Sequence, residues 1–248
     1  MTQIALITGA SRGIGRATAR LLGAAGWSVG INYRKDDHAA MEVVADVQAA
    51  GGQACAIRGD VTSEIDVISM FDAVESTFGP VTAFVNNAGI VAPVMDLVDM
   101  SAERLKHMFE VNVLGAYLCA REAARRMSTN RGGRGGSIVN VSSTAARLGS
   151  PHTFVDYAGS KGAIDTMTIG LAKELAGQGV RVNAVRPGLI DTEIHASGGQ
   201  PDRALVLGAQ TPLGRAGSAE EVAEAIVWLL SDAASYVTGA LLDVSGGR

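Results

Sequence analysis

The 248-residue sequence contains two cysteines and four histidines, and it has no long basic block. Cys55 and Cys119 are too few for a disulfide framework and have no metal-ligand spacing. The histidines are scattered, with no His-x-x-x-His or Cys-His cluster, so we expect no metal site. A formal net charge of -4 argues against nucleic acid as the main partner.

Signals for export and membrane insertion are also absent from the sequence. No charged region followed by an apolar core opens the chain, and no apolar stretch is long enough to span a bilayer. We therefore expect no membrane association and a reducing, cytoplasmic location. Hydrophobic residues make up 47% of the 248 positions, which suits one α/β domain (1–248) with a large core.

Apolar segments of strand length alternate with longer helical patterns. The predicted strands are residues 4–8, 28–33, 54–58, 81–86, 137–142, 181–186 and 240–244. The predicted helices are residues 16–25, 39–49, 64–78, 105–127, 157–175 and 219–230. Uniformly apolar strands separated by helices indicate a parallel sheet covered by helices on both faces.

Residues 188–217 form the one long stretch without such a pattern. Loops of this length inside compact domains are usually functional lids or disordered. The apolar residues Leu205, Val206 and Leu207 favour a lid, with a short helix of its own.

A glycine-rich turn joins the first predicted strand to the first predicted helix. Gly9, Gly13 and Gly15 allow a tight turn and a close approach to a pyrophosphate, and the helix start supplies free N–H groups. The spacing is longer than Gly-x-Gly-x-x-Gly, so the match to the dinucleotide fingerprint is imperfect. A purely structural turn is the alternative, but the position between strand and helix favours a nucleotide site.

The end of the second predicted strand bears on the choice of dinucleotide. NAD-selective sites place an acid there for the ribose 2′-hydroxyl, whereas this chain has Arg34 and Lys35. With Arg12, these residues could neutralise a 2′-phosphate, so we predict NADP(H), with NAD(H) as the alternative. Asp36 and Asp37 count against this choice, because either could pair with Arg34 or Lys35.

Tyr157 and Lys161 lie four residues apart and therefore share one face of a helix. A nearby ammonium favours the ionised phenol, so we expect Lys161 to lower the tyrosine pKa from about 10 toward neutrality. Alone, the pair could equally be a packed tyrosine beside a solvated lysine. The other motifs of the chain decide between this interpretation and an acid/base pair.

Taken together, these residues resemble the short-chain dehydrogenase/reductase family over nearly the whole chain. The order and spacing of the motifs carry the resemblance: Thr8-Gly-x-x-x-Gly-Ile-Gly15, Asp60-Val61, Asn86-Asn87-Ala88-Gly89, Asn112, Ser142-Ser143, Tyr157-x-x-x-Lys161, Pro187-Gly188, Leu241-Leu242-Asp243-Val244 and Gly246-Gly247. The resemblance implies a single-domain, doubly wound parallel sheet of seven strands in the order 3-2-1-4-5-6-7. It places the reaction at the carboxyl ends of the strands.

The resemblance also implies a set of cofactor-binding residues. Asp60 and Val61 would border the adenine, and Asn87 to Gly89 would pass beside the adenine-side ribose. Pro187 and Gly188 would lie against the nicotinamide, and Thr192 would bond its carboxamide. The full set is Gly9, Ser11, Arg12, Gly13, Ile14, Gly15, Arg34, Asp60, Val61, Asn87, Ala88, Gly89, Tyr157, Lys161, Pro187, Gly188 and Thr192.

For catalysis the resemblance implies a tetrad of Asn112, Ser143, Tyr157 and Lys161. Tyr157 would exchange a proton with the substrate oxygen, and Ser143 would donate a hydrogen bond to it. Lys161 would lower the tyrosine pKa and bind a nicotinamide-ribose hydroxyl, and Asn112 would hold a water that links Lys161 to solvent. Ser142 is the alternative to Ser143, because adjacent strand side chains point to opposite faces.

The loop before Tyr157 is one residue longer than in many members of the family. His152 in this loop either borders the substrate or is an exposed loop residue.

The resemblance implies a small-molecule carbonyl or alcohol substrate and a homotetramer built through residues 105–127 and 157–175. Reduction of 3-oxoacyl groups on a carrier protein, oxidation of sugars of the glucose type, and reduction of small ketones or steroids all stay open. A carrier protein would need a basic docking surface, for which Arg203, Arg125 and Arg126 are candidates. A non-catalytic regulator that senses dinucleotides is the alternative from another functional class.

Overall fold

Seven parallel strands form one sheet in the computed structural model, which describes residues 3–248. Their order is β3-β2-β1-β4-β5-β6-β7, which confirms the predicted fold class and strand order. The strands are β1 (Ile4–Ile7), β2 (Ser28–Tyr33), β3 (Gln53–Arg58), β4 (Ala83–Asn86), β5 (Gly136–Val141), β6 (Val180–Pro187) and β7 (Leu241–Val244).

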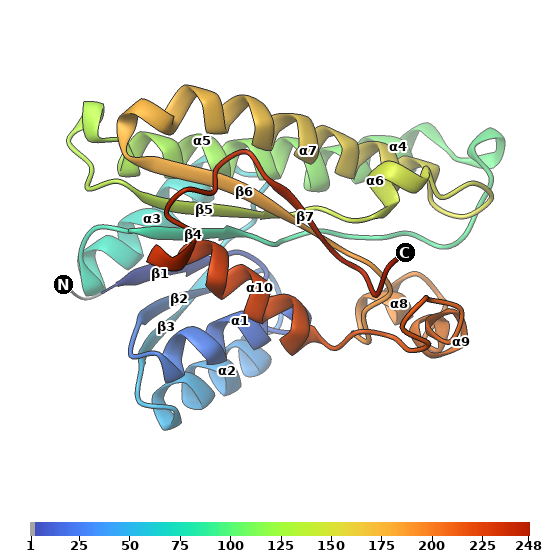
Figure 1. Ribbon diagram of the computed structural model, residues 1–248, viewed down its shortest axis with the longest axis horizontal. Coiled ribbons are helices and arrows are strands. Elements are labelled where there is room, and N and C mark those ends of the chain that lie inside the picture. The colour runs from blue at the N-terminus through green and yellow to red at the C-terminus, as the bar shows by residue number, and fades with distance from the viewer. Residues whose placement is uncertain (1–2) are drawn as a thin grey trace.

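Helices cover both faces of the sheet (Figure 1). One layer holds α1 (Gly13–Ala24), α2 (Asp37–Ala49) and α10 (Ala219–Leu230), and the other holds α3 (Glu64–Phe78), α5 (Ala116–Met127) and α7 (Val155–Leu175). Shorter helices are α4 (Ala102–Phe109) and α6 (Ala145–Leu148), and 3-10 turns cover Leu97–Asp99, Thr129–Arg131, Ala176–Gln178 and Asp232–Ala234.

The alternation of side chains along β1 divides the core into two layers. Ala5 and Ile7 pack toward α1 and α10, whereas Ile4 and Leu6 pack toward α3 and α7. All four side chains are buried, so the strand has no polar face. A strand buried on both faces reads as a continuous apolar run, which is why the sequence predicted a parallel sheet.

The predicted helix over residues 105–127 differs from the structure. A π-helical segment, Glu110–Gly115, lies between α4 and α5 and carries Asn112. The Asn112 amide donates to the Ile90 carbonyl at 2.9 Å and accepts from the Ile90 N–H at 2.8 Å. This side-chain contact with the segment after β4 accompanies the wider turn, and π segments are often found at functional sites. A pattern of apolar residues does not distinguish a π turn from an α turn.

The residues 188–217 segment lies beyond one end of the sheet, where Figure 1 labels α8 (Ile194–Ser197) and α9 (Arg203–Gly208). The sequence predicted one short helix in this segment, whereas the structure has two. Its two ends are tied together, because Gly217 donates to the Leu189 carbonyl and accepts from the Asp191 N–H, both at 2.9 Å. The two ends of the segment are therefore paired with each other, and Leu213 within it donates to the Gly246 carbonyl at 3.1 Å.

Within residues 3–248, no helix has both the length and the apolar composition required to cross a bilayer. The same residues contain no group of three histidine, cysteine or acidic side chains placed to hold a metal ion.

Candidate active site

A cavity of about 890 Å³ opens at the carboxyl ends of the central strands. Every residue of the predicted site lines this cavity except Gly15 and Asn112. Those two residues are buried, and their surroundings are described below. The structure thus brings the predicted cofactor-binding and catalytic residues to one place.

The glycines of the first turn are required for two different reasons. Gly9 and Gly13 have φ angles of +61° and +54°, a region that favours glycine. Gly15 has an ordinary backbone angle, but a Cβ there would lie 2.7 Å from the Asn87 amide nitrogen and 2.8 Å from the Gly9 carbonyl oxygen. The turn is therefore both sharply bent and tightly packed.

The start of α1 has no side-chain cap, and Arg12 occupies the N-cap position. By contrast, Asp36, Ser63, Ser101 and Ser218 cap the starts of α2, α3, α4 and α10. The first N–H groups of a helix need acceptors, and Gly13 and Ile14 of α1 line the cavity. A glycine cradle beside free N–H groups fits the pyrophosphate of a dinucleotide.

Two buried residues that the sequence analysis missed hold this turn. The Asn32 side chain accepts from the Gly9 N–H at 3.1 Å and donates to the Gly59 carbonyl at 3.1 Å. The Thr8 hydroxyl accepts from the N–H groups of Asn87 and Ala88 at 2.9 and 3.0 Å. Together these bonds join the ends of β1, β2 and β4. The only available signal was a polar residue, Asn32, inside an otherwise apolar strand.

The acids that counted against an NADP(H) site have other partners. Asp36 accepts from the Ala39 N–H at 3.0 Å as the cap of α2, and Asp37 accepts from the Tyr33 hydroxyl. Neither pairs with Arg34.

Arg34 instead pairs with Asp60, with 3.0 Å between Nε and Oδ2. Burial raises the pKa of Asp60, but hydrogen bonds from Thr62 and the charge of Arg34 outweigh it and hold that pKa below its usual value. The Arg34 side chain is about half exposed, at 48%. Its guanidinium therefore lies at the open edge of the cavity, and Asp60 is its ion-pair partner.

Tyr157 lies in the first turn of α7, and Lys161 lies one turn later. The Lys161 ammonium donates to the Val141 carbonyl at 2.8 Å and lies 5.7 Å from the centre of the Tyr157 ring. The Ser143 hydroxyl is hydrogen-bonded to Tyr157, whereas the Ser142 hydroxyl donates to Asp165 at 2.7 Å. Of the two adjacent serines, Ser143 is thus the one that faces the tyrosine.

The expected lowering of the Tyr157 pKa by Lys161 was wrong. Burial raises the pKa of Tyr157 to about 12, and the hydrogen bond with Ser143 offsets only part of this rise. Burial also lowers the pKa of Lys161 to about 8, against the charge of Asp165. The ammonium contacts the ring and a carbonyl rather than the phenolic oxygen, so desolvation outweighs charge stabilisation.

Asn112 lies behind the cavity wall rather than in it. Besides its two bonds to Ile90, its amide donates to the Ser160 hydroxyl at 3.2 Å. A Cβ on Gly89 would lie 3.4 Å from the Asn112 carbonyl oxygen and 3.5 Å from the Lys161 ammonium. Asn112 and Lys161 therefore meet around Gly89.

A buried ion pair next to Tyr157 was also missed. Asp156, whose side chain is fully buried, accepts from the Tyr157 N–H at 2.9 Å. It pairs with Arg104 through two hydrogen bonds of 2.9 and 3.3 Å, and Arg104 also donates to the Pro93 carbonyl. This pair ties α4 and the segment after β4 to the first turn of α7.

The longer loop before Tyr157 turns through left-handed residues. Gly149, Ser150 and His152 have φ angles of +73°, +46° and +59°. His152 is exposed, does not line the cavity and lies 3.0 Å from Asp96. The exposed-loop alternative for His152 is therefore correct.

The far end of the cavity is lined by residues of several loops. Thr192 lies over Gly13, since a Cβ there would be 3.6 Å from the threonine side chain. Beyond it lie Phe154 and Arg203, with the guanidinium carbon 4.9 Å from the centre of the phenylalanine ring.

Comparisons with known proteins agree with this geometry. Residues 9–248 match a protein family described as enoyl-(acyl carrier protein) reductase. The chain is 54% identical to an uncharacterized oxidoreductase, YgfF, of Escherichia coli K12, over 99% of each chain.

Two solved structures have the same fold. A short-chain type dehydrogenase/reductase from Mycobacterium marinum has a TM-score of 0.92 at 36% identity, covering 99% of this chain and 94% of the other. A 3-ketoacyl-(acyl-carrier-protein) reductase from Brucella melitensis, complexed with NADH, has a TM-score of 0.91 at 33% identity, covering 99% and 98%.

Proposed function

We infer the function of this chain from its family: it belongs to the short-chain dehydrogenase/reductase family and is an oxidoreductase of that family. We propose that it uses NADP(H) to interconvert a carbonyl compound and a secondary alcohol. One observation carries this proposal. Ser143, Tyr157 and Lys161 meet in the same cavity as the glycine turn and the uncapped start of α1.

The chain offers contacts along the whole length of a dinucleotide. Ser11 to Gly15 and the start of α1 would hold the pyrophosphate, and Asp60 with Val61 would border the adenine. Asn87 to Gly89 would line the ribose, and Pro187, Gly188 and Thr192 would hold the nicotinamide. When bound, NADP(H) supplies or accepts the hydride at the reacting carbon.

The side chains of the cavity move the proton. Ser143 donates a hydrogen bond to the substrate oxygen, where negative charge develops during reduction. Tyr157 donates its proton to that oxygen, and its pKa of about 12 keeps it protonated at neutral pH. Lys161, with a pKa of about 8, is charged at neutral pH and places its positive charge 5.7 Å from the centre of the Tyr157 ring. These protonation states favour reduction near neutrality.

We assign Asn112 a positioning role. Its side chain holds the segment after β4 against the π-helical segment through both polar groups of Ile90. Gly89 of that segment lies between Asn112 and Lys161. Fixing this segment keeps the Lys161 ammonium in place beside the Tyr157 ring.

The charges at the end of β2 support a preference for NADP(H). Arg12 and Arg34 line the cavity, and Asp36 and Asp37 are engaged elsewhere. The pair between Arg34 and Asp60 is partly exposed, and such pairs contribute little to stability. Arg34 can therefore turn to a 2′-phosphate, which a planar guanidinium binds through two hydrogen bonds.

Turnover of a substrate panel tests the assigned chemistry. The purified protein should oxidise NADPH with at least one ketone, aldehyde or sugar, and Tyr157→Phe should lower kcat/KM by about 10² to 10⁴ because the proton donor is lost. Undiminished turnover in Tyr157→Phe would defeat the mechanism.

Fluorescence titration with NADPH and NADH tests the cofactor assignment. NADPH should bind more tightly, and Arg34→Gln should reduce that preference by about 10- to 100-fold, the range for hydrogen bonds to a charged group. Arg20→Gln, on the exposed side of α1, should leave it unchanged. A clear preference for NADH in the unaltered protein contradicts our assignment.

We also propose a homotetramer. Large apolar side chains are exposed along α4, the π-helical segment, α5 and α7, namely Phe109, Leu114, Tyr117 and Ile169. Trp228 of α10 and Tyr236 are also exposed. Burial of such surface between subunits is favourable. Light scattering should give four times the chain mass at micromolar concentration, and a monomer there rules the proposal out.

We further propose a reducing, cytoplasmic location. Neither cysteine forms a disulfide, and burial raises the pKa of Cys55 and raises that of Cys119 to about 12, so both stay protonated thiols. Cell fractionation against compartment markers tests the location.

A further inference from the structure

The end of the cavity beyond Tyr157 combines apolar walls with positive charge. Its apolar side chains are Val91, Leu148, Phe154, Leu189 and Ile194. Two guanidinium groups, those of Arg203 and Arg248, line the same end. Such a lining suits a molecule with an apolar body and one negatively charged group.

No acid balances this charge inside the cavity. Of the acidic residues that line it, Asp36 and Asp60 lie at the end of β2 and after β3, which is the adenine side. The third, Glu193, lies beside Gly13 at the first turn, 3.8 Å from where a Cβ would stand. The far end therefore has no acidic side chain among its lining residues, and the main-chain oxygen of Arg248 accepts from the Arg147 guanidinium at 2.8 Å.

Arg203 is held in place by uncharged partners. Its guanidinium stacks over Phe154 at 4.9 Å and donates to the Gln200 side chain at 2.6 Å. Within residues 3–248, neither Arg203 nor Arg248 has an acidic side chain within ion-pair distance. A stacked guanidinium keeps its edge free for two parallel hydrogen bonds to an anion.

The placement of Arg203 is electrostatically unfavourable for the chain itself. Arg203 is the first residue of α9, where a cation opposes the helix dipole. Burial lowers its pKa, and the nearby charge of Arg248 lowers it further. The contacts of Arg203 with Phe154 and Gln200 bring no negative charge, whereas an anionic ligand would offset the repulsion from Arg248 and from the helix dipole.

We propose that Arg203, stacked on Phe154 and assisted by Arg248, binds an anionic group at the end of the substrate remote from the reacting carbon. This inference rests on the proposed function, because it assigns a substrate class to the same cavity. The substrate is a small carbonyl compound or alcohol with an apolar body and a terminal carboxylate or phosphate. A planar guanidinium binds either anion through two parallel hydrogen bonds, and the experiment distinguishes the two anions.

Two pairs of ketones that differ mainly in charge provide the test. The carboxylate pair is 4-acetylbenzoate and its methyl ester, and the phosphate pair is 4-acetylphenyl phosphate and 4-methoxyacetophenone. With NADPH, the protein should favour the charged member of at least one pair by tenfold or more in kcat/KM. The pair that shows this preference identifies the anion.

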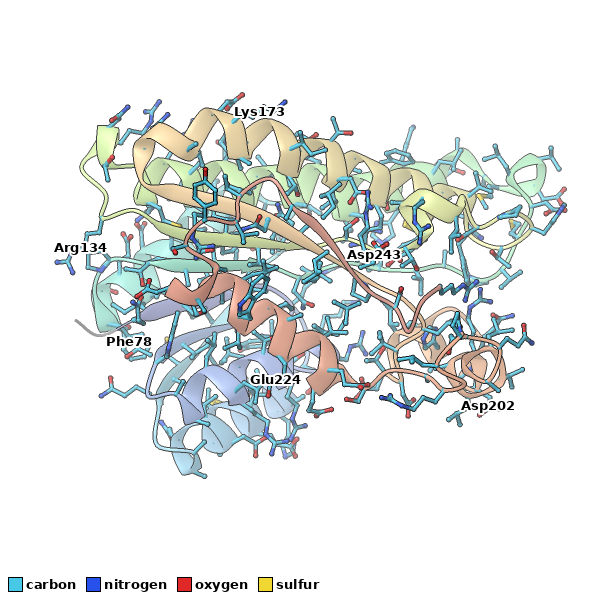
Figure 2. The ribbon with its side chains drawn as sticks, viewed as in Figure 1. Phe78, Arg134, Lys173, Asp202, Glu224 and Asp243 are labelled. Carbon is cyan, nitrogen blue, oxygen red and sulfur yellow. The ribbon has the colours of Figure 1, made fainter. Side chains whose placement is uncertain are left out.

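Substitution of Arg203 should act more strongly on the charged ketone than on its neutral partner. Arg203→Gln should lower the ratio of kcat/KM for the charged ketone to that for the neutral ketone by about 10- to 100-fold, the range for a hydrogen-bonded charge. Arg203→Lys should retain part of the preference, because it keeps the charge but not the planar fork. Arg134→Gln is the control; Figure 2 shows Arg134 at the opposite end of the molecule from Asp202, the neighbour of Arg203.

The outcomes separate this inference from the proposed function. Equal losses for charged and neutral ketones in Arg203→Gln, or no charge preference in the unaltered protein, overturn the inference while the reductase activity stands. If neither these ketones nor any member of the substrate panel is turned over, the proposed function fails. In that case thermal shift with 4-acetylbenzoate and 4-acetylphenyl phosphate decides the inference. A shift that Arg203→Gln abolishes supports the anion site, and equal or absent shifts overturn it.

Discussion

The cavity has a nucleotide end, at residues 9–14 and 34–36, and a substrate end, around Phe154 and Arg203. Different kinds of chemical group line these two ends. At the nucleotide end, main-chain groups and small residues do the positioning, and buried Thr8 and Asn32 hold them. At the substrate end, side chains of several loops provide the lining, among them Phe154 and residues of the 188–217 segment, whose Leu205 is 64% exposed. The nucleotide end is part of the core, whereas the 188–217 segment is joined to the rest of the chain by a few backbone hydrogen bonds, such as that from Leu213 to Gly246.

Because of this difference, the fold constrains the residues at the nucleotide end more strongly than the residues at the substrate end. Replacement of a residue at the nucleotide end disturbs packing that three strands share. Replacement in the residues 188–217 segment changes which molecule fits while the sheet stays intact. Substitutions should therefore differ strongly in their cost to stability according to the end of the cavity at which they lie.

The largest loss of stability is expected at the buried ion pair between Arg104 and Asp156. Arg104→Met leaves the fully buried Asp156 without its partner and should lower the free energy of unfolding by about 3 to 5 kcal/mol. Denaturant titration measures this change. Arg121→Met, which removes an exposed pair with Glu64, should cost about 1 kcal/mol or less. Equal losses in the two variants would mean that the buried pair does not brace the core.

A smaller loss is expected at the first turn. Gly15→Ala places a methyl group 2.7 Å from the Asn87 amide and should cost about 1 to 3 kcal/mol of stability, together with a weaker NADPH affinity. Thermal unfolding and fluorescence titration measure the two effects. Gly177→Ala, where no atom lies within 4 Å of the added carbon, should change neither. An alanine tolerated at residue 15 would show that the turn yields more easily than its packing indicates.

The pH dependence of reduction tests the centre of the cavity. Because burial lowers the pKa of Lys161 to about 8, its ammonium is present below that pH and lost above it. Reductive kcat/KM should therefore be constant below about pH 8 and fall about tenfold per unit above it, while Tyr157 stays protonated up to about pH 12. Lys161→Arg should remove this fall, whatever its absolute rate, because a guanidinium stays charged. A profile that is flat to pH 10 contradicts the assignment.

The smallest loss of stability is expected in the residues 188–217 segment. Leu205→Ser should change the free energy of unfolding by less than about 0.5 kcal/mol, because the side chain is exposed. Leu229→Ala, at a fully buried position of α10, should cost about 2 to 5 kcal/mol. Denaturant titration of both variants sharpens the contrast between the core and the loop, and a large loss at Leu205 would remove it.

The sequence predicted the features that depend on local backbone rules. Glycines at residues 9 and 13 follow from a turn that needs positive φ angles, and the strand order follows from the motifs of the family. The side chain of Ser143, rather than that of Ser142, lies against Tyr157, as the motif order favoured. These features leave marks at fixed spacings along the chain.

Features that depend on contacts between residues far apart in the chain were either not predicted or predicted wrongly. The direction of the Tyr157 pKa shift depends on how deeply the ring is buried, which spacing to Lys161 does not reveal. The partner of Arg104 lies 52 residues along the chain, and the π turn at Asn112 depends on a contact with Ile90. No periodicity in the sequence reports such contacts.

The uncapped start of α1 has a consequence for stability if it binds the proposed dinucleotide. The first N–H groups of α1 have no side-chain cap, unlike those of α2 and α3, so a bound anion would act as a folding ligand. At a hundredfold excess over its dissociation constant, a ligand that binds only the folded chain adds about 2.7 kcal/mol of stability. Under the proposed function, a cell depleted of the dinucleotide would degrade this protein faster, and its abundance would follow the supply of that dinucleotide.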